Sequence, residues 1–271
     1  MLKACPMNIP YKALFLSHGG GPLPLLGHED HREMISCLQH IATLLPKPDA
    51  IVVVSAHWEA RVPTITSGAN PGLIYDYYGF PPESYEIQYP CPGNPSLAQK
   101  IHQLLSDAGI ESALDDQRGF DHGLFVPLSI LYPAADIPCV QLSLTSSLNP
   151  ELHINVGRAL QSLTSDNILL VGSGFTFHNM RAFFCPDTEE SRRLNLAFED
   201  WLRATCSQTD ISEEVRKESL IHWDEAPGAR YCQPREEHLL PLHVCYGVAQ
   251  SPCVEYFNPQ IMNKKSSMIL W

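Results

Sequence analysis

The sequence has 271 residues, of which 44% are hydrophobic and 18% are charged, a composition close to that of average globular domains, so the chain can bury enough apolar surface to fold. Its 30 acidic and 18 basic residues give a formal net charge of -12, which repels both the phosphates of nucleic acids and anionic membrane surfaces. We therefore expect neither nucleic acid nor a membrane as a partner.

Short apolar segments that are typical of strands alternate with longer segments that are typical of helices. The strand-like segments are nearly continuous apolar runs bounded by polar, Gly or Pro residues, as in strands that are buried on both faces. Alternation of this kind predicts an α/β fold in which a central, largely parallel or mixed sheet is flanked by helices. In chain order we expect a strand at 12–17, a helix at 29–45, a strand at 50–56, helices at 95–108 and 124–132, a strand at 138–144, a helix at 150–163, a strand at 168–172, helices at 191–206 and 236–248, and one or two edge strands within 254–271.

Specific residues mark two helix starts and one long loop. Asn94-Pro95 and Asn149-Pro150 each place a capping residue before a proline in the first helical turn, where the missing N–H of proline does no harm. The Pro- and Gly-rich stretch 80–95 is typical of a long surface or active-site loop. Because no repeat, low-complexity tract or linker divides the chain, we predict one domain over residues 1–271.

The cysteines and the amino-terminal segment indicate where the protein resides. Nine cysteines are an odd number and include no C-x-x-C pair, which favours reduced, mostly buried thiols over a disulfide framework or a zinc knuckle. The apolar run 13–16 is interrupted by Ser17 and His18 and is too short for a signal-peptide core or a membrane-spanning helix. We therefore expect a cytoplasmic protein.

Three of the predicted strands are followed by a histidine. His18 follows the first strand, His57 the second, and His178 the strand at 168–172. Because the carboxyl ends of parallel strands converge on one crevice, we expect these three imidazoles to meet there. Two further candidates, His238 and His122, lie at the entries to predicted helices.

A cluster of histidines at this edge of the sheet allows two interpretations. Neutral imidazole is a good ligand for iron(II) and zinc, and open mononuclear sites take three protein ligands and leave positions for a substrate. A single histidine after a strand is, however, more often a hydrogen-bonded structural residue. The spacing alone supports a metal site and a structural cluster about equally.

Eight sequence motifs extend over nearly the whole chain, from about residue 12 to about residue 246. They are FLSHGG with His18, VVVSAHWE with His57, the Gly79-Phe80-Pro81 loop, YPCPGNPSLA, GFDHG with His122, LYPAADIPCVQLSL, VGSGFTFHN with His178 and EEHLLPLHV with His238. In these motifs and in their order the chain resembles the class III extradiol dioxygenases, and most of all the LigB-type DOPA 4,5-dioxygenase group.

The resemblance implies a non-haem iron(II) enzyme that opens the ring of a small catechol, such as DOPA, with dioxygen. The positions that match the family's metal ligands are His18, His57 and His238. His178 matches the acid/base histidine of the wider superfamily and, in structures of this group, can also approach the metal, so it is a candidate for both roles. His122 matches a second histidine of the pocket, which is expected to hydrogen-bond the substrate or the bound oxygen.

The chain departs from the family pattern at two places. His18 is followed by Gly19-Gly20-Gly21-Pro22, where members of the family often have His-Gly-Ser-Pro or His-Gly-Asn-Pro, and this difference puts the substrate range in doubt. Asn179-Met180 resembles the bacterial branch more than the plant pigment branch, so the resemblance does not imply betalain synthesis.

Two alternative functions use the same histidines. One is a zinc-dependent hydrolase, and the other is a non-catalytic metal-binding protein similar to the Memo family. Zinc has no redox chemistry and cannot support oxygen insertion, although its affinity for nitrogen ligands lets it occupy such a site in a purified or crystallised protein. The presence of both His122 and His178 favours an enzyme over a Memo-like protein. A serine esterase is excluded because no serine lies in a G-x-S-x-G motif.

Three more histidines are interpreted as structural. His28 and His31 lie three residues apart near a predicted helix start and are expected to form a solvated surface pair. His243 lies five residues after His238 on the same predicted helix and points roughly 140° away from it, so we expect His243 in the core or behind the site.

Overall fold

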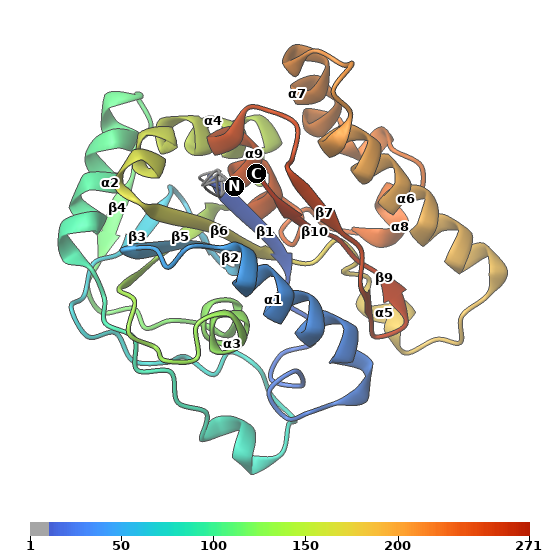
Figure 1. The fold of residues 1–271 in the computed structure, drawn as a ribbon, viewed down its shortest axis with the longest axis horizontal. Coiled ribbons are helices and arrows are strands. Elements are labelled where there is room, and N and C mark those ends of the chain that lie inside the picture. The colour runs from blue at the N-terminus through green and yellow to red at the C-terminus, as the bar shows by residue number, and fades with distance from the viewer. Residues whose placement is uncertain (1–10) are drawn as a thin grey trace, which may run out of the picture.

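An eight-stranded mixed sheet forms the centre of the computed structural model, which describes residues 11–271 (Figure 1). The four central strands, β5, β2, β6 and β1, are parallel, and both edges include antiparallel neighbours. The predicted α/β fold is therefore confirmed. In spatial order the strands are β4 (Ala113–Asp115), β3 (Thr64–Thr66), β5 (Cys139–Thr145), β2 (Ala50–Ala60), β6 (Ile168–Gly174), β1 (Ala13–Ser17), β10 (Met268–Leu270) and β7 (Glu255–Phe257), with a separate hairpin of β8 (Gln260–Ile261) and β9 (Lys264–Lys265).

Helices cover both faces of this sheet. The pair α4 and α9 packs on one face, and α1 and α3 lie on the other (Figure 1). The backbones of α4 and α9 approach so closely that only glycine fits at position 157: a Cβ atom there would lie 2.1 Å from the carbonyl oxygen of Val244. The helices are α1 (Arg32–Leu44), α2 (Pro95–Asp107), α3 (His122–Leu131), α4 (Pro150–Ala159), α5 (Met180–Phe183), α6 (Glu189–Ser207), α7 (Glu213–Ile221), α8 (Ala229–Cys232) and α9 (Leu240–Ala249).

Both predicted helix caps are confirmed. Asn94 accepts a hydrogen bond from the backbone N–H of Leu97 at 3.0 Å, and Asn149 accepts one from Leu152 at 2.8 Å. Each bond satisfies one of the amide groups that have no partner at the start of a helix. The loop expected at 80–95 contains one short 3-10 helix, Pro82–Tyr85.

Several boundaries differ from the prediction for local physical reasons. The strand expected at 50–56 continues to Ala60 after an irregularity in its pairing with β5. The helix expected at 236–248 begins only at Leu240, because the carbonyl of His238 accepts a hydrogen bond from Phe175 outside the helix. The expected helix at 150–163 ends at Ala159 and is followed by a 3-10 segment. The strands β3 and β4 were not predicted, because three residues are too few to show periodicity.

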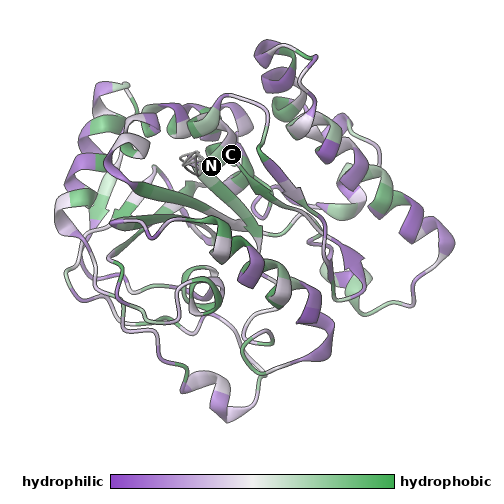
Figure 2. Ribbon diagram, viewed as in Figure 1, coloured by the Kyte–Doolittle hydropathy of each residue, from purple (hydrophilic) through white to green (hydrophobic). Residues whose placement is uncertain are grey.

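The central strands of the sheet are largely hydrophobic, whereas helices such as α6 and α7 carry many hydrophilic residues (Figure 2). Strands β1 and β5 are buried at every position. No helix within residues 11–271 is long and apolar enough to cross a membrane. The eight cysteines in the described part of the chain are free thiols, and five of them are buried; Cys5 lies outside the described residues.

Candidate metal centre

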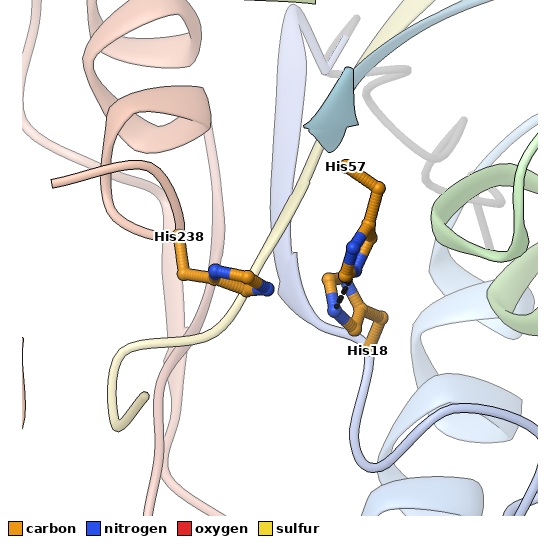
Figure 3. A group of neighbouring side chains, drawn as sticks. All are labelled: His18, His57 and His238. Carbon is orange, nitrogen blue, oxygen red and sulfur yellow. Dashed lines mark hydrogen bonds between the residues drawn. The ribbon is translucent and has the colours of Figure 1, made fainter. Parts of the chain in front are cut away.

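Three imidazoles from distant parts of the chain point toward one another at the carboxyl edge of the parallel strands (Figure 3). His18 directly follows β1, His57 lies in β2, and His238 lies just before α9. Their nearest ring nitrogens lie within 4.8 Å of one another, and the Nε2 atoms of His18 and His57 are 3.0 Å apart. The expectation that strand ends gather histidines holds for His18 and His57, because β1 and β2 both pair in parallel with β6.

A bulge in β2 aims His57 at this centre. Ser55 pairs with Ser143 of β5, whereas Glu59 pairs with Leu144, so the segment between Ser55 and Glu59 is looped out of the ladder. Bulges of this kind re-aim side chains near functional sites. The hydroxyl of Ser55 accepts a hydrogen bond from the backbone N–H of His57 at 3.2 Å and so helps to hold the looped segment.

His238 reaches the centre because the segment 232–238 packs against the end of β6. The N–H of Phe175 donates to the carbonyl of His238 at 2.9 Å, and the N–H of His178 donates to the carbonyl of Cys232 at 2.8 Å. Gly174 makes this contact possible, since a Cβ atom there would lie 2.1 Å from the carbonyl oxygen of His238. Any larger residue at position 174 would push the segment away from the sheet.

The three imidazoles are held in the neutral form that binds metal ions. Burial, followed by repulsion from the neighbouring imidazoles, lowers the pKa of His18 and of His57 well below the usual value and the pKa of His238 to about 3. A neutral imidazole keeps a lone pair on one nitrogen, whereas an imidazolium has none to offer. These side chains are therefore ready to act as ligands throughout the neutral pH range.

The donor atoms fit a metal ion. His238 Nε2 is buried and has no hydrogen-bond partner among the described residues, which is costly for a polar atom unless a further group satisfies it. Imidazole nitrogens bind divalent metals at about 2.1 Å, so two of them at right angles around one ion lie about 3.0 Å apart. The distance between His18 Nε2 and His57 Nε2, 3.0 Å, matches that arrangement. His18 keeps its other nitrogen on Ser173 Oγ, also at 3.0 Å.

His122 lies beside this centre and is paired with a carboxylate. It begins α3, and its ring centroid is 3.9 Å from that of His57. Asp76 accepts hydrogen bonds from His122 Nδ1 at 2.8 Å and from the backbone N–H of His122 at 3.0 Å. Burial raises the pKa of Asp76, but the hydrogen bonds from His122 outweigh it and lower that pKa overall. Asp76 is therefore a carboxylate at neutral pH.

His178 stacks on His238, whereas His122 lies beside His57. The two ring centroids are 3.3 Å apart, and the ring planes differ by 17°. Glu237 lies within 3.2 Å of His178 Nδ1 and within 3.0 Å of His238 Nδ1, in both cases through Oε1. The structure thus groups His178 with Glu237 and His238, and not with His18 and His57.

Sequence reasoning missed the two carboxylates of this region. Glu237 adjoins His238 in the EEH motif, so its proximity was available as a signal. Asp76 had no signal, because it lies in a loop whose path cannot be read from local pattern. His18, His57, His122, His178 and His238 are all brought into one region.

Of two histidines that were expected to be structural, one lies where it was expected and the other does not. The expectation of a solvated surface pair is wrong for His31, which is buried and whose Nε2 accepts a hydrogen bond from the N–H of Gly20 at 3.0 Å. His31 thereby supports the glycine loop that follows His18. The core position expected for His243 is confirmed, since it is buried between the carbonyl oxygens of Leu239 and Leu220.

Comparisons with known proteins place this geometry in a wider context. Residues 12–267 match the family described as the catalytic LigB subunit of aromatic ring-opening dioxygenase. The chain is 42% identical to dioxygenase tasH of Hapsidospora irregularis, over 86% of this chain and 76% of that protein. It is 37% identical to a 4,5-DOPA dioxygenase extradiol of Portulaca grandiflora, over 87% and 85% of the two chains, and 38% identical to one of Escherichia coli K12, over 85% and 82%.

A solved structure shares the fold as well as the sequence. The crystal structure of uncharacterized protein JW3007 from Escherichia coli K12 superposes with a TM-score of 0.75 at 32% identity. The match covers 96% of this chain and 99% of that one. The arrangement of strands that carries the histidines is therefore shared by a protein whose structure is known.

Proposed function

The chain belongs to the LigB family of aromatic ring-opening dioxygenases, and from this membership we propose that it is an iron(II)-dependent extradiol dioxygenase that opens the ring of a catechol such as DOPA. Its substrates are then a small catechol and dioxygen, and residues 1–271 form one catalytic domain. The observation that carries the proposal is the meeting of three neutral imidazoles beside two further histidines, each of which contacts a carboxylate.

His18, His57 and His238 would hold the metal. When bound, iron(II) supplies the redox chemistry that lets dioxygen react with a catechol, which no protein side chain provides. Three protein ligands leave coordination positions open for small molecules. His178 stacks on His238, so it is the candidate for a fourth ligand or for a base.

The two remaining histidines are assigned to proton transfer. A catechol must lose a proton as it binds, and a proton must be returned as the ring opens; an imidazole can perform either step near neutral pH. In this proposal His178 removes the catechol proton through Nε2, because its Nδ1 faces Glu237. His122 donates or holds a proton through its own Nε2, because its Nδ1 is bonded to Asp76.

Aromatic side chains border these histidines and suit a flat substrate. The ring centroid of Tyr77 is 5.6 Å from that of His122, and the ring centroid of Phe175 is 6.4 Å from that of His18. Such contacts favour stacking or edge-on packing of a further ring. Tyr77 is itself held in place, since its hydroxyl donates to the carbonyl of Ser84 at 2.5 Å.

The proposal is tested by oxygen uptake. Metal-free protein is loaded with iron(II) under anaerobic conditions and then mixed in air with DOPA, caffeate or protocatechuate. We expect uptake of dioxygen together with a yellow semialdehyde product seen by ultraviolet-visible spectroscopy. The zinc-loaded protein is the matched control and should consume no oxygen. If the iron-loaded protein consumes no oxygen with any catechol, the dioxygenase proposal is wrong, and a metal-binding or hydrolytic function becomes the better explanation.

A further inference from the structure

One carboxylate lies between a proposed metal ligand and a proposed proton carrier. Glu237 Oε1 lies 3.0 Å from His238 Nδ1 and 3.2 Å from His178 Nδ1, and the two rings are stacked. An ionised carboxylate accepts hydrogen bonds and donates none. Both imidazoles must therefore present an N–H to Glu237 from Nδ1, and in its neutral form each ring then carries its lone pair on Nε2.

The carboxylate of Glu237 also lies at one end of a row of charged side chains. Arg235 lies 3.3 Å from Glu237 Oε2 and makes two hydrogen bonds to the carboxylate of Glu59, at 2.6 and 2.7 Å. Glu59 lies in β2, two residues after His57. The row of charged side chains Glu59, Arg235 and Glu237 therefore connects β2, which carries His57, with the segment that carries His238. The pair of hydrogen bonds between Arg235 and Glu59 is bidentate, an arrangement that is geometrically specific.

We propose that Glu237 is a positioning residue that sets the tautomer of both His238 and His178, so that one side chain prepares a nitrogen for the metal and a second nitrogen for proton transfer. The buried, unpartnered Nε2 of His238 is the atom that this tautomer leaves free. A carboxylate behind a metal-binding imidazole also increases its basicity and fixes its ring orientation. The inference rests on the proposed function only for the role of His178; the tautomers themselves do not depend on the reaction.

The first test requires no measurement of activity. Long-range proton–nitrogen correlation spectra of the metal-free, ¹⁵N-labelled protein distinguish the two neutral tautomers of histidine. We expect the proton on Nδ1 in both His178 and His238, assigned by comparison with spectra of the single His178→Gln and His238→Gln variants. A wild-type spectrum in which either ring carries its proton on Nε2 would overturn the inference.

The second test uses Glu237→Gln, which keeps the shape of the side chain. Both Nδ1 atoms face the Oε1 position. An amide that keeps its oxygen there turns its N–H₂ group toward Arg235, another donor, and an amide turned the other way faces both rings with N–H₂, so both must change their tautomer. We expect iron(II) and zinc affinity, measured by chelator competition, to fall about 10–100-fold. Glu236→Gln is the matched control, because that neighbouring carboxylate faces Arg230 at 2.7 Å and not the site; its metal affinity should stay at the wild-type level.

The outcomes separate the two proposals. Wild-type metal affinity and unchanged tautomers in Glu237→Gln would contradict the positioning role. Weaker metal binding in that variant, together with a wild-type protein that binds iron but opens no catechol, would retain the positioning role and reject the dioxygenase function. Glu237→Asp keeps the charge but shortens the side chain, so we expect partial recovery of affinity, which a purely structural role for the residue would not produce.

Discussion

The two sides of the histidine centre are built on the same plan but held differently. On each side one carboxylate lies behind a proposed proton carrier and near a proposed ligand. Glu237 is within hydrogen-bonding distance of both His178 and His238. Asp76 bonds tightly to His122, whereas His57 Nδ1 is 3.8 Å away from it, beyond a direct hydrogen bond.

This difference indicates which part of the structure orients each proposed ligand. His238 comes from a loop before α9 and depends on its neighbour Glu237 for the state of its ring. His57 is fixed mainly by the bulged strand and by Ser55, and Asp76 forms its hydrogen bonds with His122 instead. Loss of the Glu237 carboxylate should therefore disturb metal binding, and loss of the Asp76 carboxylate should disturb proton transfer.

The largest effect is expected from removing one of the proposed metal ligands. His18→Ala or His57→Ala leaves two imidazoles, and metal affinity should fall by more than the roughly 10–100-fold that loss of a supporting partner costs, with ring opening below detection. Inductively coupled plasma analysis after dialysis, with oxygen uptake on the same sample, measures both. Full activity in either variant would show that the replaced histidine is not a metal ligand.

A large but selective effect is expected from His122→Ala. The metal should remain bound, because His122 is not one of the three proposed ligands; it lies in a second group, formed with His57 and Asp76. Loss of a positioned acid or base lowers turnover by about 10²–10⁴-fold. Steady-state kinetics at measured metal content tests this, with the exposed His40→Ala as control. Metal loss in His122→Ala would instead show that His122 acts as a ligand.

A direct comparison of the two carboxylates gives an intermediate effect. Asp76→Asn should lower kcat about 10–100-fold while metal affinity stays close to wild type, whereas Glu237→Gln should lower metal affinity as well. Glu86→Gln, an exposed acid of the same loop as Asp76, controls for the change of charge. Equal losses of metal affinity in Asp76→Asn and Glu237→Gln would show that the two sides are not held differently.

The smallest effect concerns a buried histidine outside the centre. Burial lowers the pKa of His153 to about 4, whereas a histidine in an unfolded chain titrates near 6.5. Between these values the unfolded state binds more protons, so the contribution to stability is complete above pH 6.5 and is lost as the pH falls toward 4. Wild-type protein should therefore lose about 2 kcal/mol at pH 5 relative to pH 7 through this residue.

His153→Gln offers the measurement for that effect. Glutamine does not titrate, so the difference in unfolding free energy between pH 7 and pH 5, obtained from urea curves, should shrink by about 2 kcal/mol. The ring of His153 accepts from the N–H of Thr145 and contacts the carbonyl of Asn149, and the amide of glutamine can replace these contacts in part. An unchanged pH difference would mean that His153 is not protonated on unfolding at pH 5.

The central strands could be predicted from the sequence, because strands buried on both faces are continuous apolar runs. The proximity of His18 and His57 could be predicted as well, because the carboxyl ends of parallel strands converge. His238 was placed only through the resemblance to a family, since its loop reaches the sheet by a close contact at Gly174. Asp76 and the burial of His31 depend on the paths of loops, which no periodicity encodes. The metal-binding and catalytic roles of the five histidines remain predictions.

Anomalous diffraction at the iron absorption edge shows whether the three imidazoles share one metal ion. Crystals of the protein grown and loaded with iron(II) without oxygen should show a single strong peak about 2.1 Å from the Nε2 atoms of His18, His57 and His238. A peak bound by other residues, or the absence of any peak between these three side chains in iron-loaded crystals, would show that they do not form a shared metal site.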